Sequence, residues 1–164
     1  MKRLFIVLLA LSLLALPALA EAAQTGPFDY TKDILEDGSL IFYFEDLSLT
    51  LPVDWAGKLL VLPDENRVNF YQAASYEKYL EEGLEGGGFL FSLGASVNTG
   101  FAEDLPSFQY LGFSERSMMN YFLETPSDYP AWTEDADIRA EWDEMYAAIT
   151  EFVVPNAAFY PAED

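Results

Sequence analysis

FLFSLGASV, residues Phe89 to Val97, is the segment of this chain that decides its fold. Apolar side chains fall at every second position, 89, 91, 93, 95 and 97, and mostly small or polar residues lie between them. An apolar period of two is typical of a β-strand with one buried face. The segment therefore predicts a central strand of a sheet.

Weaker strand signals lie on both sides of this segment. Leu47, Leu49 and Leu51 alternate with polar residues, and Pro52 ends the run. Further strands are predicted at residues 40–44, 58–62, 68–71, 108–113 and 118–123. The turn formers at 63–66 predict a hairpin between the strands that flank them, and residues 114–116 predict a tight turn between the last two.

Helical patterns are fewer than strand patterns. Residues 73–85 predict a short helix or irregular segment, because Gly83 and the triple glycine 86–88 interrupt it. The last element is the clearest helix, with Thr133 or Asp135 as its cap and Pro155 beyond its end. Its apolar stripe consists of Ile138, Trp142, Met145, Tyr146, Ile149, Phe152 and Val153. We expect an α+β fold, in which a largely antiparallel sheet of five to seven strands carries this long C-terminal amphipathic helix on one face.

The N-terminus has the pattern of a secretory signal peptide. Lys2 and Arg3 precede a short apolar run, and residues 17–20 end in the small-x-small pattern that signal peptidase cleaves. The alternative, a membrane anchor, needs about 20 apolar residues, and Pro17 stops this run before that length. We predict a signal peptide at 1–20, a flexible leader at 21–33 and a single domain at 34–160. The protein would be secreted and would keep no stable membrane anchor after cleavage.

Charge narrows the choice of partners. The chain has 28 acidic and 8 basic residues and a formal charge of −20. Loss of Lys2 and Arg3 with the signal peptide would leave six basic residues and a charge of −22. Nucleic acid is an unfavourable partner, because its binding depends on Lys and Arg at the phosphates. The acidity is explained most simply by solubility outside the cell, and more specifically by a cationic or basic partner.

Several short motifs resemble a known kind of domain. They are Leu51-Pro52-Val53-Asp54-Trp55, Asn69-Phe70-Tyr71, Ala74-Ser75-Tyr76-Glu77, Gly87-Gly88-Phe89-Leu90-Phe91-Ser92, Glu103-Asp104-Leu105-Pro106-Ser107, Leu111-Gly112 and Pro126-Ser127-Asp128. In this order they resemble an uncharacterised secreted domain of Gram-positive bacteria, which is similar to the PsbP-like α/β/α sandwich. The resemblance implies a fold used mostly for binding and assembly, and it implies no catalytic residues. The chain departs from the pattern at Met118-Met119.

Composition limits the chemistry that the chain can perform. It contains no histidine and no cysteine, which excludes Ser-His-Asp, Cys-His and histidine- or thiolate-metal sites. A carboxylate-dependent hydrolase of polysaccharide or peptidoglycan remains an alternative, because paired acids can work without histidine. A calcium-dependent module is a second alternative, suggested by the alternating acids at 135–141. Arg139 occupies a ligand position there, however, and acids at a helix N-terminus are the simpler interpretation.

Aromatic residues in proline-bounded loops are the best candidates for ligand contact. Tyr129 and Trp132, with Asp128 beside them, lie between Pro126 and the last helix, and flat rings there can stack on sugar or peptide. Trp55 is a weaker candidate of the same kind, and anchoring of the loop is the simpler role for each ring. We therefore expect a secreted, non-enzymatic binding or assembly module with a protein or carbohydrate partner, no cofactor, no metal site and no catalytic residue.

Overall fold

A computed structural model describes residues 26–27, 34–64, 67–98 and 105–160. The predicted signal peptide, residues 1–20, lies outside the described residues. Of the predicted leader, only β1 (Gly26–Pro27) is described, and it pairs with residues 60 and 61. In the described part of the chain, no helix has the length and apolarity needed to cross a membrane.

The main sheet is antiparallel and has the strand order β1-β4-β5-β6-β8-β7. Its longer strands are β4 (Leu59–Asp64), β5 (Arg67–Gln72), β6 (Phe89–Ser96), β7 (Phe108–Ser114) and β8 (Met119–Glu124). The two predicted hairpins are confirmed as β4–β5 and β7–β8. β6 lies between β5 and β8, as expected for a central strand.

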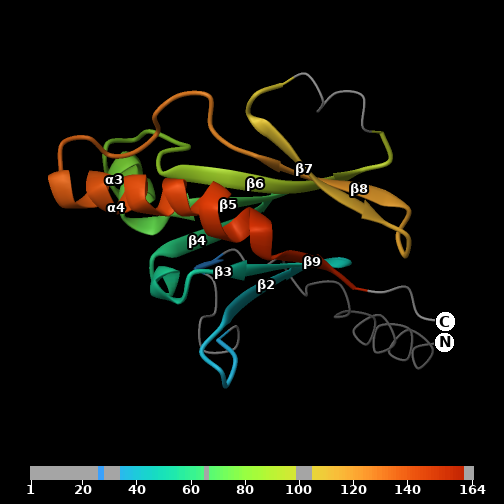
Figure 1. Ribbon diagram of the computed structural model, residues 1–164. Coiled ribbons are helices and arrows are strands. Elements are labelled where there is room, and N and C mark those ends of the chain that lie inside the picture. The colour runs from blue at the N-terminus through green and yellow to red at the C-terminus, as the bar shows by residue number, and fades with distance from the viewer. Residues whose placement is uncertain (1–25, 28–33, 65–66, 99–104, 161–164) are drawn as a thin grey trace, which may run out of the picture.

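A second, three-stranded sheet lies below the first in Figure 1 and has the order β2-β3-β9. The strands β2 (Leu40–Phe44) and β3 (Leu47–Leu51) were predicted as strands, but not as a separate sheet. β9 (Ala157–Phe159) was not predicted, because three residues after a proline carry no readable period. It pairs antiparallel with residues 47–49 of β3.

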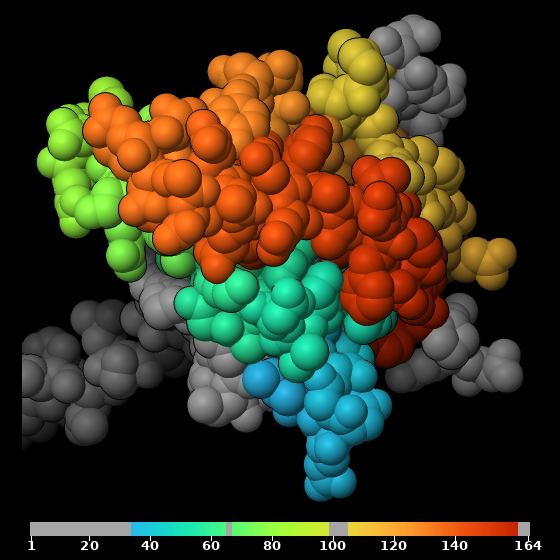
Figure 2. Space-filling model, turned by 60° about the vertical axis from the view of Figure 1, so that its left-hand side comes forward, coloured from blue at the N-terminus to red at the C-terminus, as the bar shows by residue number. Residues whose placement is uncertain are grey.

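The helices lie on one side of the main sheet and at one end of it (Figure 1). α3 (Ala73–Glu81) follows β5 directly, and α4 (Ala136–Ala148) passes in front of the sheet. Asp135 caps the N-terminus of α4: its Oδ1 accepts hydrogen bonds from the backbone N–H groups of Asp137 and Ile138. It continues into a π-helical turn, η2 (Ile149–Val153), and a 3-10 turn, η3 (Val154–Asn156). In Figure 2 the orange α4 lies against the teal segment that contains η1 (Val53–Trp55).

One apolar core joins both sheets and α4. The alternation in β3 is confirmed, because Leu47, Leu49 and Leu51 are all buried. From the C-terminal stripe, the fully or nearly fully buried residues are Trp142, Met145, Ile149 and Val153. Phe152 is exposed instead, because a π-turn takes more residues per revolution than an α-turn and shifts the stripe. The α+β class, the largely antiparallel main sheet and the packed C-terminal helix are thus confirmed.

A β-bulge in β6 corrects the simple alternation predicted for residues 89–97. Phe70 pairs with Phe91, but the next residue of β5, Tyr71, pairs with Phe89. Phe70 and Tyr71 are consecutive, so their side chains lie on opposite faces of the sheet. Paired residues share a face, and Phe91 and Phe89 therefore also lie on opposite faces. Leu90 is the extra residue and is buried in the core. Val97 lies beyond the end of the strand and is exposed.

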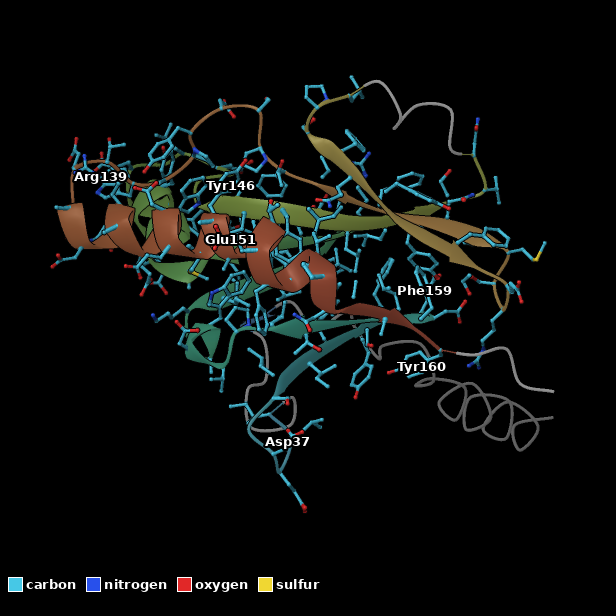
Figure 3. All side chains as sticks on the ribbon, in the orientation of Figure 1. Asp37, Arg139, Tyr146, Glu151, Phe159 and Tyr160 are labelled. Atoms are coloured by element: carbon cyan, nitrogen blue, oxygen red, sulfur yellow. The ribbon has the colours of Figure 1, made fainter. Side chains whose placement is uncertain are left out.

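Two turns tie the sheets together at the other end of the molecule. The Asp46 carboxylate accepts a hydrogen bond from the Ser114 hydroxyl at 2.8 Å and lies 3.6 Å from the Arg116 guanidinium. Hydrogen bonds from Ser117 and Ser114 keep the pKa of Asp46 below its ordinary value. Figure 3 shows Phe159 between β9 and the β7–β8 pair, where its ring lies 5.4 Å from that of Tyr121. These contacts fix the small sheet against the large one.

Candidate functional site

An open cavity of about 510 Å³ lies where α3, the start of β6 and the loop after β8 meet. Figure 1 shows this loop, in orange, arching above β6. The aromatic residues in the lining are Tyr71, Tyr79, Phe89 and Tyr129, and the acidic residues are Glu85, Glu124 and Asp128. The remaining lining residues are Gly86, Gly87, Ser107, Thr125, Pro126, Ser127 and Pro130. The volume is within the range typical of sites for small organic ligands.

Two glycines allow the loop before β6 to lie against α3. A Cβ atom at Gly88, where φ is +76°, would lie 2.6 Å from the backbone oxygen of Gln72. One at Gly87 would lie 2.1 Å from the ring of Tyr79. The Gly88 backbone N–H also donates to the Pro130 carbonyl at 2.7 Å. The triple glycine, predicted as a turn, therefore also allows close packing against α3 and forms part of one wall of the cavity.

A buried hydrogen-bond network connects α3, α4 and the loop after β8 next to the cavity. Gln72, which is 0% exposed, donates from Nε2 to the Ile138 carbonyl and to Oε1 of Glu141, both at 2.9 Å. Its Oε1 accepts from the Ser75 hydroxyl at 2.6 Å, and Oγ of Ser75 accepts from the Trp132 backbone N–H at 3.0 Å. No buried side-chain nitrogen or oxygen in the described part of the chain lacks a partner. α3, α4 and the loop are thus linked by satisfied hydrogen bonds, which favours a single rigid arrangement.

Tyr129 is held at the cavity rim by two residues of α4. Its hydroxyl donates to Oδ1 of Asp143 at 2.7 Å, and its ring packs edge-on against Trp142 with the centroids 4.9 Å apart. The side chain is nevertheless 47% exposed. Partial burial, followed by the bond to Asp143, raises the pKa of Tyr129 to about 12 from its ordinary value of 10, while Arg139, at the beginning of α4 in Figure 3, lowers it. The phenol is therefore a fixed, neutral hydrogen-bonding group at physiological pH.

This pKa makes a testable prediction about the alkaline titration of Tyr129. The folded state favours the neutral Tyr129 phenol. The contribution of this phenol to the free energy of unfolding is therefore fully present below pH 10 and is lost as the pH rises through about 12. We expect ultraviolet difference spectra of wild type and Tyr129→Phe to show that Tyr129 is still protonated at about pH 11, where an ordinary phenol is ionised. Asp143→Asn should lower the pKa of Tyr129, and Glu144→Gln, on the same helix, should leave it unchanged. A pKa of Tyr129 near 10 in wild type would contradict the bond to Asp143.

The structure brings the predicted loop residues together only in part. Tyr129 and Asp128 both line the cavity, and Asp128 is exposed. Trp132 does not line it but packs edge-on against Tyr79, with the ring centroids 5.3 Å apart. Trp55 is 2% exposed and belongs to the core, which matches its simpler, anchoring role. Trp132 acts here as a support for a lining residue.

Sequence reasoning missed the lining residues that come from regular elements. These are Tyr71 of β5, Tyr79 of α3, Phe89 of β6, Glu124 of β8 and Glu85, which follows α3. The tyrosines at 71, 76 and 79, close to a triple glycine, were the available signal, because glycine beside aromatic residues often marks close packing. The face on which Phe89 lies depends on the bulge, which no local pattern predicts.

A smaller hollow of about 200 Å³ adjoins the cavity on the same face of the main sheet. Both are lined by Glu124, which accepts a charged hydrogen bond from Arg67. The small residues of β6 on this face, Ser92, Gly94 and Ser96, form its floor. The face is therefore grooved across β5, β6 and β8.

The acids predicted as an alternative calcium loop have another role in the structure. Asp135 caps the N-terminus of α4 through its Oδ1. Within the described ranges, no group of three or more acidic side chains is arranged to hold a metal ion. Acids at a helix N-terminus, the simpler interpretation of residues 135–141, account for this segment.

No protein-family model, curated protein or solved structure matches this chain. The resemblance to the PsbP-like sandwich therefore stays a prediction.

Proposed function

We propose that this protein is a secreted, non-enzymatic binding module that holds a protein or carbohydrate partner at or beyond the cell envelope, with the cavity at Tyr129 as its binding site. The signal-peptide pattern at 1–20 supports secretion. The observation that carries the binding role is the cavity itself, in which four aromatic rings and several hydroxyl and carboxylate groups converge. Convergent apolar and polar groups in one cavity are the usual composition of a ligand site.

The aromatic rings of the lining are held in place by neighbouring rings before any ligand binds, which supports the proposed binding role. Tyr71 packs against Phe89, Tyr79 against Trp132, and Tyr129 against Trp142. Rings that are already fixed lose little conformational entropy when a ligand binds, so more of the contact energy appears as affinity. The open rim also leaves room for a ligand that is part of a larger partner.

The alternative of a carboxylate-dependent hydrolase rests on the three acids in the same cavity. Such an enzyme needs one carboxyl group that gives up a proton and a second that attacks or activates water. Glu124 is already engaged by Arg67 and by the Ser92 hydroxyl, so it serves a structural contact. Glu85 and Asp128 remain, and the chain offers no histidine to assist them. Binding without catalysis is the better-supported function.

Tryptophan fluorescence offers a direct test of the proposed site. Trp132 and Trp142 contact lining residues, so a ligand in the cavity should change their emission, whereas Trp55 lies in the core. The purified protein would be titrated with soluble peptidoglycan and wall-polysaccharide fragments, and in a second arm with fractionated envelope proteins. Binding in one arm should be saturable and at least about tenfold weaker in Tyr129→Ala.

Tyr43→Ala is the matched control, because Tyr43 is a similarly exposed tyrosine on β2, outside the cavity lining. It should bind like wild type. Equal binding by both variants, or no binding in either arm, would reject the cavity as the functional site. Release of new reducing ends from the wall fragments would favour the hydrolase instead.

A further inference from the structure

The charges around the aromatic cavity are unbalanced. Its lining contains three carboxylates and no lysine or arginine. Arg67 neutralises Glu124, but Glu85 and Asp128 form no ion pair within the described part of the chain. The chain as a whole carries 28 acidic residues against 8 basic ones, which adds to the negative potential.

Most basic side chains elsewhere are already paired and compensate for these acids only in part. Within the described ranges, Lys58, Arg67, Lys78 and Arg116 each pair with a carboxylate. Arg139 lies on α4, outside the lining of the cavity, and its charge acts on Tyr129 at the rim. An anionic ligand would therefore meet repulsion in the cavity, and a neutral ligand would leave the negative potential unused.

The rings in the lining suit a cation that is itself partly apolar. The π-face of a tyrosine or phenylalanine attracts an ammonium group within about 6 Å, and several rings around one cavity bind alkylated ammonium groups especially well. A metal ion fits poorly, because no acidic group of three is arranged to hold one in the described residues and the cavity of about 510 Å³ is far larger than a metal ion needs. The size, the rings and the acids together favour an organic cation.

We propose that the cavity binds an alkylammonium group, with Tyr71, Tyr79 and Tyr129 supplying ring faces or edges and Asp128 and Glu85 supplying countercharge. This inference rests on the proposed function and names the chemistry of its ligand. The group can belong to a quaternary ammonium compound such as choline or to a lysine side chain of a partner protein. Both share the cation and the aliphatic carbons next to it, and binding data on each will tell them apart.

The test compares the binding of choline with that of 3,3-dimethylbutan-1-ol, the neutral isostere in which carbon replaces the charged nitrogen. Affinities are measured by calorimetry and tryptophan fluorescence at constant ionic strength. A second arm uses lysine amide acetylated on its α-nitrogen, which keeps the side-chain ammonium group. The corresponding norleucine derivative is its neutral counterpart. We expect at least one cation to bind saturably and about fivefold or more tighter than its isostere. Asp128→Asn should weaken this binding about two- to fivefold, because it removes one exposed countercharge.

Asp54→Asn is the matched control, since Asp54 is an exposed aspartate on η1, outside the lining. It should bind the cation like wild type, which separates a local contact from the net charge. Tyr71→Leu should also weaken binding, and Asp128→Asn keeps the test decisive if Tyr71→Leu fails to fold.

The remaining outcomes distinguish this inference from the proposed function. Equal affinity for cation and isostere, or equal loss in Asp128→Asn and Asp54→Asn, would overturn the cation site while leaving an apolar binding cavity. Binding of wall fragments at Tyr129 without any binding of the cations would overturn it in the same way. Absence of every ligand from the cavity would overturn both proposals.

Discussion

Gly88→Ala is expected to lower the free energy of unfolding by about 2–5 kcal/mol. Two separate effects contribute. An L-residue at φ +76° is strained, and the new Cβ would lie 2.6 Å from the Gln72 carbonyl oxygen and 2.9 Å from Cβ of Ser75. The obstacles are backbone and a short buried side chain, which cannot move aside as the end of a long side chain could. Urea denaturation followed by circular dichroism would measure the change.

Gly86→Ala separates the two effects. Gly86 has a similar φ of +79°, but a Cβ there meets no atom within 4 Å. This variant should therefore lose only the conformational part, about 1–2 kcal/mol. If both variants lost the same stability, the close approach of Gly88 to α3 would be wrong, and with it the wall of the cavity.

Trp142→Ala is expected to cost about 3–5 kcal/mol, the usual cost of removing a large buried aromatic side chain. Trp142 is 3% exposed and lies in the core cluster. Its ring stacks on Tyr146 with the centroids 4.9 Å apart and supports Tyr129, and its Nε1 donates to the Phe89 carbonyl at 3.2 Å. The variant should also free Tyr129 and abolish its elevated pKa.

Two companion variants show which part of Trp142 matters. Trp142→Phe keeps an aromatic ring but leaves the Phe89 carbonyl without its donor, so a smaller loss of about 1–3 kcal/mol is expected. Phe152→Ala removes an exposed aromatic residue from η2 and should cost less than about 1 kcal/mol. Thermal and urea unfolding of the three variants give the comparison. A loss in Trp142→Ala no larger than that in Phe152→Ala would show that α4 is not anchored through this ring.

The elements that could be predicted from sequence are those whose signals lie within the element itself. β3 alternates leucines with polar residues, the β4–β5 hairpin has its turn formers between its strands, and α4 has both a cap and a stripe. Each of these signals lies within a few residues of the element that it describes. The second sheet could not be predicted in this way, because β9 becomes a strand only by pairing with β3, far away in the chain.

The same division applies to the candidate site. Tyr129 and Asp128 were predicted from loop chemistry, which is local. Phe89 was assigned to the wrong face, because the bulge beside it depends on how β6 pairs with β5. The walls formed by Tyr71 and Tyr79 depend on the packing of α3 against the glycine turn, which is a tertiary contact. Of the three loop residues predicted to contact a ligand, Tyr129 and Asp128 lie in the lining and Trp132 does not, and the rest of the lining required the fold.

The pairing of β9 with β3 also has a consequence for the order of folding. Residues 157–159 complete a sheet whose other strands lie at 40–51, so this contact closes a loop of more than a hundred residues. Contacts so distant in sequence form late and slow the search for the native state. Until residues 157–159 have been synthesised, the edge of β3 that they cover stays unpaired. A chain still emerging from the ribosome therefore cannot complete the small sheet until residues 157–159 are free to pair with β3.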